Sequence, residues 1–516
     1  WPAASRLGTE GGAADSSQDK GKLMRIIFFP VGSRVIHLQQ EEHCLSPECT
    51  EAGVHIFKKI NWSADPCENF FEFACGQWIK ETPIPEDYSS YGTYSWVRQG
   101  VNIKLRELLE IPIDEGKEIE VVQKAKLLYQ SCMNESAIEW EDSKPLLKFL
   151  RQPHLRWPVL ETNNGPEGTW VEEDFNLLEM LAFLRGKCNS GIFIQLFVGT
   201  DDKNSNKHIF KLDQGSVFLP SEEDYLTNST EAEKSRHALL QLMIDIAVLL
   251  GANTTTAQID MQSALEFETQ VAKILIPHSN RTSEALYNKL SVLKLQETIP
   301  RFDWLRYLKL VIDTDLYPEL SHINTSEEVI VYVPQYFKDL FPLLDTVDNR
   351  TIANYVVWRI VYRRISNLSQ RFLTRRLEFL KTEDLVAGVR WAFVDMLDKE
   401  NDWMDPETKT KAKEKAHGVL AKIGYPDFIL NDTIINAYFR NLTVSHTEYF
   451  DNVLRSLQFF SQTGFSYLRS HVSKTEWYTS PTTVNAFYSP TTNQISEYLS
   501  FGFWMGVAAV SVRVNT

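Results

Sequence analysis

Five long segments carry apolar residues at the 3.6-residue period of an α-helix, and this pattern restricts the chain to a mainly helical fold. In the first, Val121, Ala125, Leu128 and Tyr129 lie on one stripe. A helix buries such a stripe against a core, so core packing accounts for all five segments. The predicted helices span residues 118–133, 172–184, 231–250, 257–276 and 350–365.

One more helix has a marked start, because Asp405, Pro406 and Glu407 supply an N-cap, a first-turn proline and an acid at the positive end. It is expected to continue to Leu420. A hairpin is predicted from strands at 191–199 and 207–212. Its loop, 202–207, partly fits a calcium loop, but Lys207 replaces the turn glycine and strands flank it, which disfavours calcium.

A stretch near the end, residues 483–495, reads as an edge strand that holds a peptide. Val484, Phe487 and Tyr488 favour strands, and the Asn485 amide both donates and accepts hydrogen bonds. A free strand edge can align an extended peptide through main-chain hydrogen bonds. A purely structural strand is the alternative.

Two further features indicate the secretory pathway. Four of the six cysteines are packed into residues 44–75, where disulfides are expected, and the spacings of four and seven residues disfavour zinc. Several of the ten Asn-x-Ser/Thr acceptors are expected to carry glycans. The acceptors are Asn61, Asn134, Asn228, Asn253, Asn280, Asn324, Asn349, Asn367, Asn431 and Asn441.

Charge and hydropathy exclude other classes. The net charge of -15 argues against nucleic-acid binding. Residues 1–43 are expected to be disordered. The apolar run at 24–36 is broken by Pro30 and Arg34 and is shorter than the ~18 to 20 residues of a membrane span, so it is a degenerate anchor.

The sequence shows no catalytic or metal site of a common type. None of the eleven histidines begins His-Glu-x-x-His, and no two lie four residues apart. Gly-x-Ser-x-Gly and phosphate-loop motifs are also absent from the sequence. The residues alone predict a glycosylated, disulfide-linked, mostly helical ectodomain without visible chemistry.

A set of motifs nevertheless resembles the neprilysin family of zinc metalloendopeptidases from about Cys44 to Ile495. It comprises Cys44-x4-Cys49 and residues 65–67, 73–78, 123–129, 131–136, 423–426, 484–488 and 493–495. The resemblance implies a type II membrane protein with a mainly α, two-lobed ectodomain that encloses oligopeptide substrates. It also implies that Asn485, Ala486 and Arg98 bind substrate. Ser90 stands where neprilysin has an arginine, which weakens the expectation of a preference for free C-terminal carboxylates.

Within the family, five segments resemble the phosphate-regulating endopeptidase branch, which implies cleavage of acidic bone-matrix peptides, phosphate balance and mineralisation. They are residues 85–92, 156–161, 165–168, 333–340 and 389–393. The family binds zinc through a His-Glu-x-x-His helix and a later glutamate, both beyond the Val484–Tyr488 strand, and this chain lacks that region. The resemblance therefore implies no bound zinc and no catalytic residue here.

Two departures from the family divide the chain. A segment that carries a cysteine in relatives is omitted near 379–384, and the tail 496–516 matches nothing in the family. The expected regions are 1–43, an N-terminal peptidase domain at 44–428, the start of the catalytic domain at 429–495, and the tail. Exon skipping, a retained intron or a faulty gene model would each account for both departures.

The resemblance also bears on the cysteines. It pairs Cys44 with Cys49, assigns the partners of Cys67 and Cys75 to the missing C-terminal part and that of Cys132 to the omitted segment, and leaves Cys188 without a partner. Four unpaired thiols predict retention in the cell and disulfide-linked oligomers. Two interpretations stay open. The first is a member of the zinc metalloendopeptidase family that lacks the catalytic residues. The second is a non-catalytic product, which either binds peptides, interferes with the complete enzyme or is an inert fragment.

Overall fold

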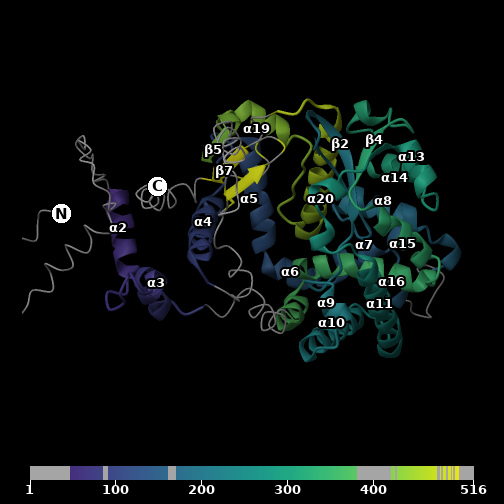
Figure 1. Ribbon diagram of the computed structural model, residues 1–516, viewed down its shortest axis with the longest axis horizontal. Helices are drawn as coiled ribbons and strands as arrows, with labels where there is room; N and C mark the ends of the chain where they lie inside the picture. The colour runs from purple at the N-terminus through teal and green to yellow at the C-terminus, as the bar shows by residue number, and fades with distance from the viewer. Residues whose placement is uncertain are drawn as a thin grey trace, which may run out of the picture.

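The computed structural model describes residues 47–84, 91–160, 170–379, 420–424 and 427–473, and, beyond them, 477, 480, 482–483, 486–489, 491 and 494–498. It confirms a mainly helical fold with small β elements (Figure 1). The α-helices are α2 (Pro47–Lys59), α3 (Phe70–Glu81), α4 (Thr93–Glu110), α5 (Glu120–Met133), α6 (Glu135–Glu141), α7 (Lys144–Leu150), α8 (Leu177–Cys188), α9 (Glu223–Leu226), α10 (Thr230–Leu249), α11 (Thr254–Ile274), α12 (Ser283–Leu286), α13 (Val292–Thr298), α14 (Trp304–Val311), α15 (Pro334–Leu344), α16 (Asn349–Arg364), α19 (Asp432–Tyr438) and α20 (Tyr449–Ser466). Short 3-10 turns link them, among them η3 (Glu172–Asp174) and η6 (Ile365–Asn367).

Four of the five helices predicted from periodicity are confirmed within three residues at each end, as α5, α10, α11 and α16. The fifth prediction, 172–184, is wrong at its start. There the chain forms η3, and α8 begins only after Asn176, whose side chain accepts a hydrogen bond from the Glu179 N–H. An asparagine that satisfies a free N–H in this way marks the first turn of a helix.

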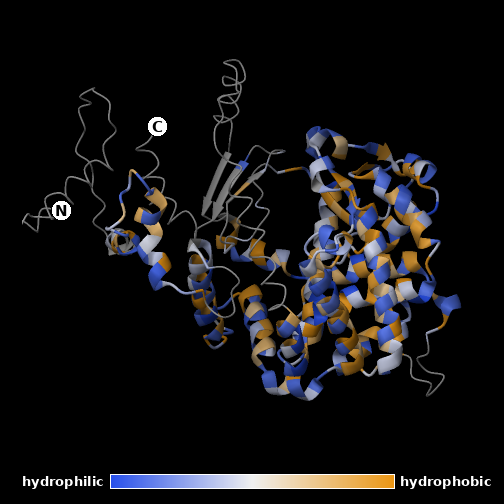
Figure 2. Ribbon diagram, turned by 60° about the horizontal axis from the view of Figure 1, so that its bottom comes forward, coloured by the Kyte–Doolittle hydropathy of each residue, from blue (hydrophilic) through white to orange (hydrophobic). Residues whose placement is uncertain are grey.

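Helix α16 lies at the centre of the large helical body. Every residue from Thr351 to Val361 is buried, so the helix is covered on all sides rather than along one stripe. It packs against α11, while α8 packs against α14 and α20. The largest fully buried side chains, which include Trp304, Trp358 and Phe372, belong to this body, and Figure 2 shows hydrophobic residues gathered between its helices.

The first sheet has the order β1-β2-β4-β3. β1 (Ile194–Asp201) and β2 (Asn204–Gln214) form the predicted hairpin, and β4 (Glu328–Val331) joins β2 in parallel and β3 (Lys289–Ser291) antiparallel. The predicted loop at 202–207 is wrong, because β2 already begins at Asn204 and only Asp202 and Lys203 turn the chain.

The second sheet has the order β5-β7-β6 and lies beside α19 and α4 in the view of Figure 1. β5 (Leu420–Gly424) pairs with β7 (Gln494–Tyr498) in parallel, and β6 (Ala486–Ser489) pairs with β7 antiparallel. Leu420 is therefore in a strand and does not end a helix; residues 405–419 lie outside the described residues. In this pairing Ser496 to Tyr498 lie opposite Lys422 to Gly424.

None of the helices in the described ranges is long and apolar enough to cross a membrane. The apolar run at 24–36 lies outside these ranges, as do Cys44, Ser90 and Asn485.

Candidate functional site

The stretch predicted as one edge strand, residues 483–495, contains β6 and the first two residues of β7, so the prediction of a single strand is wrong. β6 pairs with β7 on one side and is the outermost strand of its sheet among the described strands. Ala486 lies opposite Glu497, Phe487 opposite Ser496 and Ser489 opposite Gln494. The Phe487 side chain is 39% exposed. An edge of this kind offers backbone groups that an extended peptide can pair with, and an exposed aromatic ring beside them.

Arg98, the other residue implied to bind substrate, lies on α4 and is exposed. In the described part of the chain it makes no hydrogen bond, ion pair or ring contact. The structure therefore leaves its guanidinium available to a ligand but does not join it to β6 by a contact.

The four cysteines predicted to lack partners are free thiols in the described ranges. Cys67 is exposed, Cys75 and Cys132 are half-buried, and Cys188 is buried. Burial raises the pKa of the Cys188 thiol to about 12. Cys49 lies on α2, and its predicted partner Cys44 lies outside the described residues.

The glycan acceptors differ in their accessibility. Asn61 is 7% exposed, and its Nδ2 donates to Glu72 Oε1 at 2.7 Å. Asn367 is half-buried and donates from Nδ2 to the Tyr449 hydroxyl at 2.9 Å, while Asn349 is also half-buried. The acceptors at 134, 228, 253, 280, 324, 431 and 441 are exposed.

The described residues do not fit a zinc site. Among the described residues no three His, Cys, Asp or Glu side chains are grouped so that they could hold a metal ion. The complete sequence contains no His-Glu-x-x-His motif to supply a helical pair of ligands. We therefore assign no step of chemistry to a metal in these residues.

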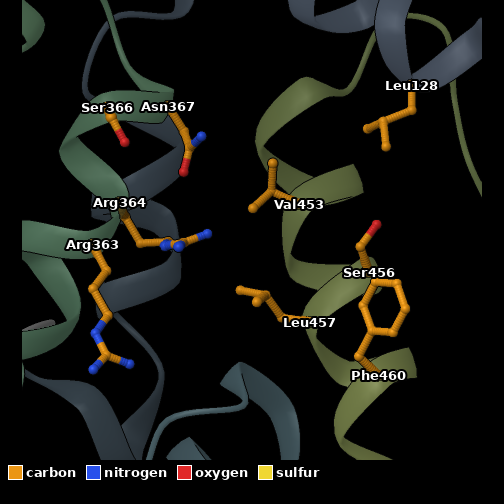
Figure 3. Close-up of a pocket in the computed structure, with 9 residues that line it drawn as sticks. All are labelled: Leu128, Arg363, Arg364, Ser366, Asn367, Val453, Ser456, Leu457 and Phe460. Atoms are coloured by element: carbon orange, nitrogen blue, oxygen red, sulfur yellow. The ribbon is translucent and has the colours of Figure 1, made fainter. Parts of the chain in front are cut away.

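A cavity of about 260 Å³ opens between the end of α16, η6 and α20 (Figure 3). Sequence reasoning did not identify it, because its two arginines look like the basic residues that commonly end a helix. The lining residues are Leu128, Arg363, Arg364, Ser366, Asn367, Val453, Ser456, Leu457 and Phe460.

Two polar atoms of this cavity are buried without a hydrogen-bond partner: Arg364 Nη1 and Asn367 Oδ1. Burial lowers the pKa of Arg364. The neighbouring Arg363 is exposed and donates from Nη1 to Ser190 Oγ at 3.0 Å. The lining contains no carboxylate, so the positive charge of Arg364 is uncompensated within it.

Comparison with known proteins relates most of the chain to one family. The family model Peptidase family M13 matches residues 66–383 and 380–426. Mouse membrane metallo-endopeptidase-like 1 is 33% identical over 510 residues, with 88% of this chain and 65% of the relative covered. Human neprilysin is 32% identical, with 88% and 66% covered, and human endothelin-converting enzyme 1 is 31% identical, with 88% and 62% covered. The chain thus spans just under two thirds of the length of these relatives.

Solved structures share the fold. The zinc metalloprotease Zmp1 of Mycobacterium tuberculosis, in complex with an inhibitor, superposes with a TM-score of 0.68 at 21% identity and covers 86% of this chain and 69% of its own. PepO from Lactobacillus rhamnosis gives a TM-score of 0.62 at 18% identity, with 82% and 69% covered.

Proposed function

Since the chain belongs to peptidase family M13, a family of zinc metalloendopeptidases, we propose that it binds oligopeptides along the edge strand β6. The observation that carries the proposal is the position of β6 at the edge of its sheet among the described strands, because β6 begins at the implied substrate residue Ala486 and follows Asn485 in the sequence. Strand addition uses main-chain hydrogen bonds, so it tolerates many peptide sequences. Exposed Arg98 then favours peptides with acidic residues.

We also propose a narrower assignment, to the phosphate-regulating endopeptidase (PHEX) branch of the family. Its ligands would be acidic peptides of mineralising matrix, and the protein would be a type II membrane protein of the secretory pathway. The segments at 85–92, 156–161 and 333–340 support it by resemblance.

We also propose the domain boundaries at residues 43, 428 and 495. The family match supports the omission near 379–384, because it falls into two segments that meet at residues 380–383.

We further propose that the 516 residues by themselves do not hydrolyse peptides. Metal-dependent hydrolysis needs a Lewis acid to generate the nucleophile and a carboxylate base beside it. The sequence contains no His-Glu-x-x-His motif whose histidines could bind the Lewis-acid metal, and the described residues contain no group of side chains that could hold a metal ion. A role in binding, or in interference with a complete enzyme, is then the function left to this chain.

The binding proposal is tested with a fluorescent acidic decapeptide and two N-methylated versions, each methylated at one alternate set of residues. A peptide added to a strand edge directs only every second N–H to that edge. We expect one N-methylated version to bind at least ten-fold more weakly than the parent and the other to bind like the parent. Equal binding of all three peptides would reject strand addition.

A pair of variants tests the location. Phe487→Ala removes the exposed ring of β6, and we expect a several-fold loss of peptide affinity. Phe71→Ala removes a ring that is 66% exposed on α3 and serves as the matched control, with no expected loss. Equal effects of the two substitutions would place the peptide elsewhere.

Hydrolysis is tested separately, with the same decapeptide, added zinc, and mass spectrometry of the products. We expect no cleavage and less than one zinc ion per chain. Turnover that a chelator abolishes, in protein freed of co-purifying peptidases, would contradict the proposal of inactivity and leave the binding proposal standing.

A further inference from the structure

We propose that the cavity between η6 and α20 binds the C-terminal residue of a peptide, provided that this residue has an apolar side chain. Three properties of the lining lead to this assignment: an uncompensated guanidinium, an unused hydrogen-bond acceptor and an apolar wall. None of the lining residues is among those implied to bind substrate near β6, so the site is a second, independent one.

The guanidinium of Arg364 has no anion among the residues that line the cavity. Its Nη1 is buried without a partner, and the cavity lining includes no acid. Burying a charge is costly unless the charge is paired and hydrogen-bonded. Figure 3 shows Arg364 extending from the end of α16 into the gap that faces α20. A carboxylate matches the planar, forked donors of arginine.

The acceptor is Asn367 Oδ1, which is buried and has no donor. The other end of this amide is already used, because Nδ2 donates to the Tyr449 hydroxyl. Asn367 lies three residues after Arg364, the spacing that places two side chains on one face of a helical segment. A ligand that satisfies both residues must therefore offer an acceptor and, close to it, an N–H donor.

The apolar part of the lining comes from Val453, Leu457 and Phe460 of α20 and from Leu128 of α5. In Figure 3, Val453 and Leu457 point from α20 across the gap towards Arg364 and Asn367. Phe460 is 53% exposed. The volume of about 260 Å³ is smaller than the ~300 to 1,000 Å³ of sites for drug-sized ligands, and therefore suits one residue.

A peptide C-terminus combines these three features within one residue. Its carboxylate pairs with Arg364, its amide N–H donates to Asn367 Oδ1, and an apolar side chain covers the wall. Inorganic phosphate lacks the apolar part, and a fatty acid lacks the N–H donor. The cavity thus favours peptides that end in residues such as Leu, Ile or Phe.

Four small probes test these features one by one against the full chain. N-acetyl-L-leucine carries all three features, N-acetyl-L-leucinamide lacks the carboxylate, 4-methylpentanoate lacks the N–H, and acetate lacks both the N–H and the apolar part. Ligand-observed NMR titration measures each dissociation constant. We expect N-acetyl-L-leucine to bind with a constant on the order of 1 mM, the amide at least ten-fold more weakly, 4-methylpentanoate several-fold more weakly, and acetate without saturation.

Two variants locate the binding. Arg364→Gln removes the cation and is expected to weaken N-acetyl-L-leucine at least ten-fold, whereas Arg440→Gln, at an exposed arginine beyond α19, has no expected effect. Asn367→Asp supplies an internal carboxylate to Arg364. We expect it to raise the melting temperature and to abolish binding of the probe, which keeps the test decisive if Arg364→Gln does not fold.

Several results would overturn the proposal. Equal binding of the acid and its amide would exclude carboxylate recognition, and unchanged binding by Arg364→Gln would exclude this cavity. Absence of probe binding by the parent chain, together with a lower melting temperature of Arg364→Gln, would show that another part of the chain already supplies the anion. Peptide binding at β6 is tested separately, because Phe487→Ala is expected to leave the dissociation constants of the four probes unchanged.

Discussion

Arg359 of α16 donates from Nη1 to Oε1 of Glu268 on α11 at 2.9 Å, and the two side chains are 6% and 1% exposed. Two tyrosines and the Phe218 N–H, at 2.9 Å from Oε1, also donate to the carboxylate. Tyr225 donates to Oε2 at 2.8 Å, and Tyr355 donates to Oε1 at 3.1 Å. The central helix is thus joined to its neighbour by a buried ion pair whose carboxylate is fully hydrogen-bonded.

Glu268→Gln should destabilise the fold strongly. The substitution keeps the size of the side chain but leaves the Arg359 charge buried without a counter-ion, for which a cost of about 3–5 kcal/mol is expected. Urea unfolding followed by circular dichroism measures the change. Glu297→Gln is the control, because Glu297 pairs with Lys294 on the surface and such pairs contribute about 0–1 kcal/mol. Equal losses from the two substitutions would contradict the prediction.

Asp142 should make the free energy of unfolding depend on pH in the acidic range. Arg371 donates from Nε to its Oδ1 at 2.8 Å, and this bond, with that from Ser369, lowers the pKa of Asp142 to about 2. A lowered pKa in the folded state stabilises the protein above the usual pKa near 4, and this stabilisation is lost as the pH falls from about 4 towards 2.

Asp142→Asn should therefore lower the free energy of unfolding by about 1 kcal/mol at pH 7, a value reduced by solvent screening of the partly exposed pair. The difference between parent and variant should be constant from pH 7 to pH 5 and shrink below pH 4. Asp and Asn have side chains of nearly the same shape, so the positive φ of 51° at this position strains the parent and the variant alike. A difference that stayed constant down to pH 2.5 would argue against the ion pair.

The free thiols should react in the order of their exposure. Cys67 is exposed, whereas Cys188 is buried and burial raises its pKa to about 12, so almost none of it is the reactive thiolate at pH 8. Timed alkylation with iodoacetamide, followed by peptide mass spectrometry, should label Cys67 within minutes and Cys188 only in urea. Labelling of both at one rate without urea would show that Cys188 is accessible.

Folded protein from animal cells should lack glycans at Asn61 and Asn367. Both amides already donate from Nδ2, to Glu72 and Tyr449, and a sugar on that nitrogen would displace these partners from a covered position. Glycopeptide mapping of the monomeric fraction should find glycans instead at exposed acceptors such as Asn228 and Asn441. High occupancy at Asn61 in that fraction would contradict the packing around it.

Prediction from sequence succeeded where the residues of one segment specify its structure. It failed where contacts with residues distant in sequence specify the structure. The 3.6-residue period located α5, α10, α11 and α16, because an amphipathic helix records its buried face in its own residues. The same reasoning placed the start of α8 too early, because acidic residues suit both a 3-10 turn and a first helical turn. It also ended the hairpin loop too late, since the strand pairing that extends β2 is a tertiary property.

The sequence by itself determined the helical class, the β-forming residues of β6 and the family of this protein, because periodicity, β-forming residues and motifs are properties of the chain itself. The position of β6 at the edge of its sheet follows from its pairing with β7. Only the tertiary structure decided how groups distant in sequence meet. It covered α16 on every side, which turned Arg359 and Glu268, 91 residues apart, into a buried ion pair. It also placed Arg364 and Asn367 against the apolar face of α20, nearly a hundred residues later, and left Arg364 Nη1 and Asn367 Oδ1 without hydrogen-bond partners. Burial and charge pairing depend on the three-dimensional neighbours of a side chain, and its own stretch of sequence does not specify them.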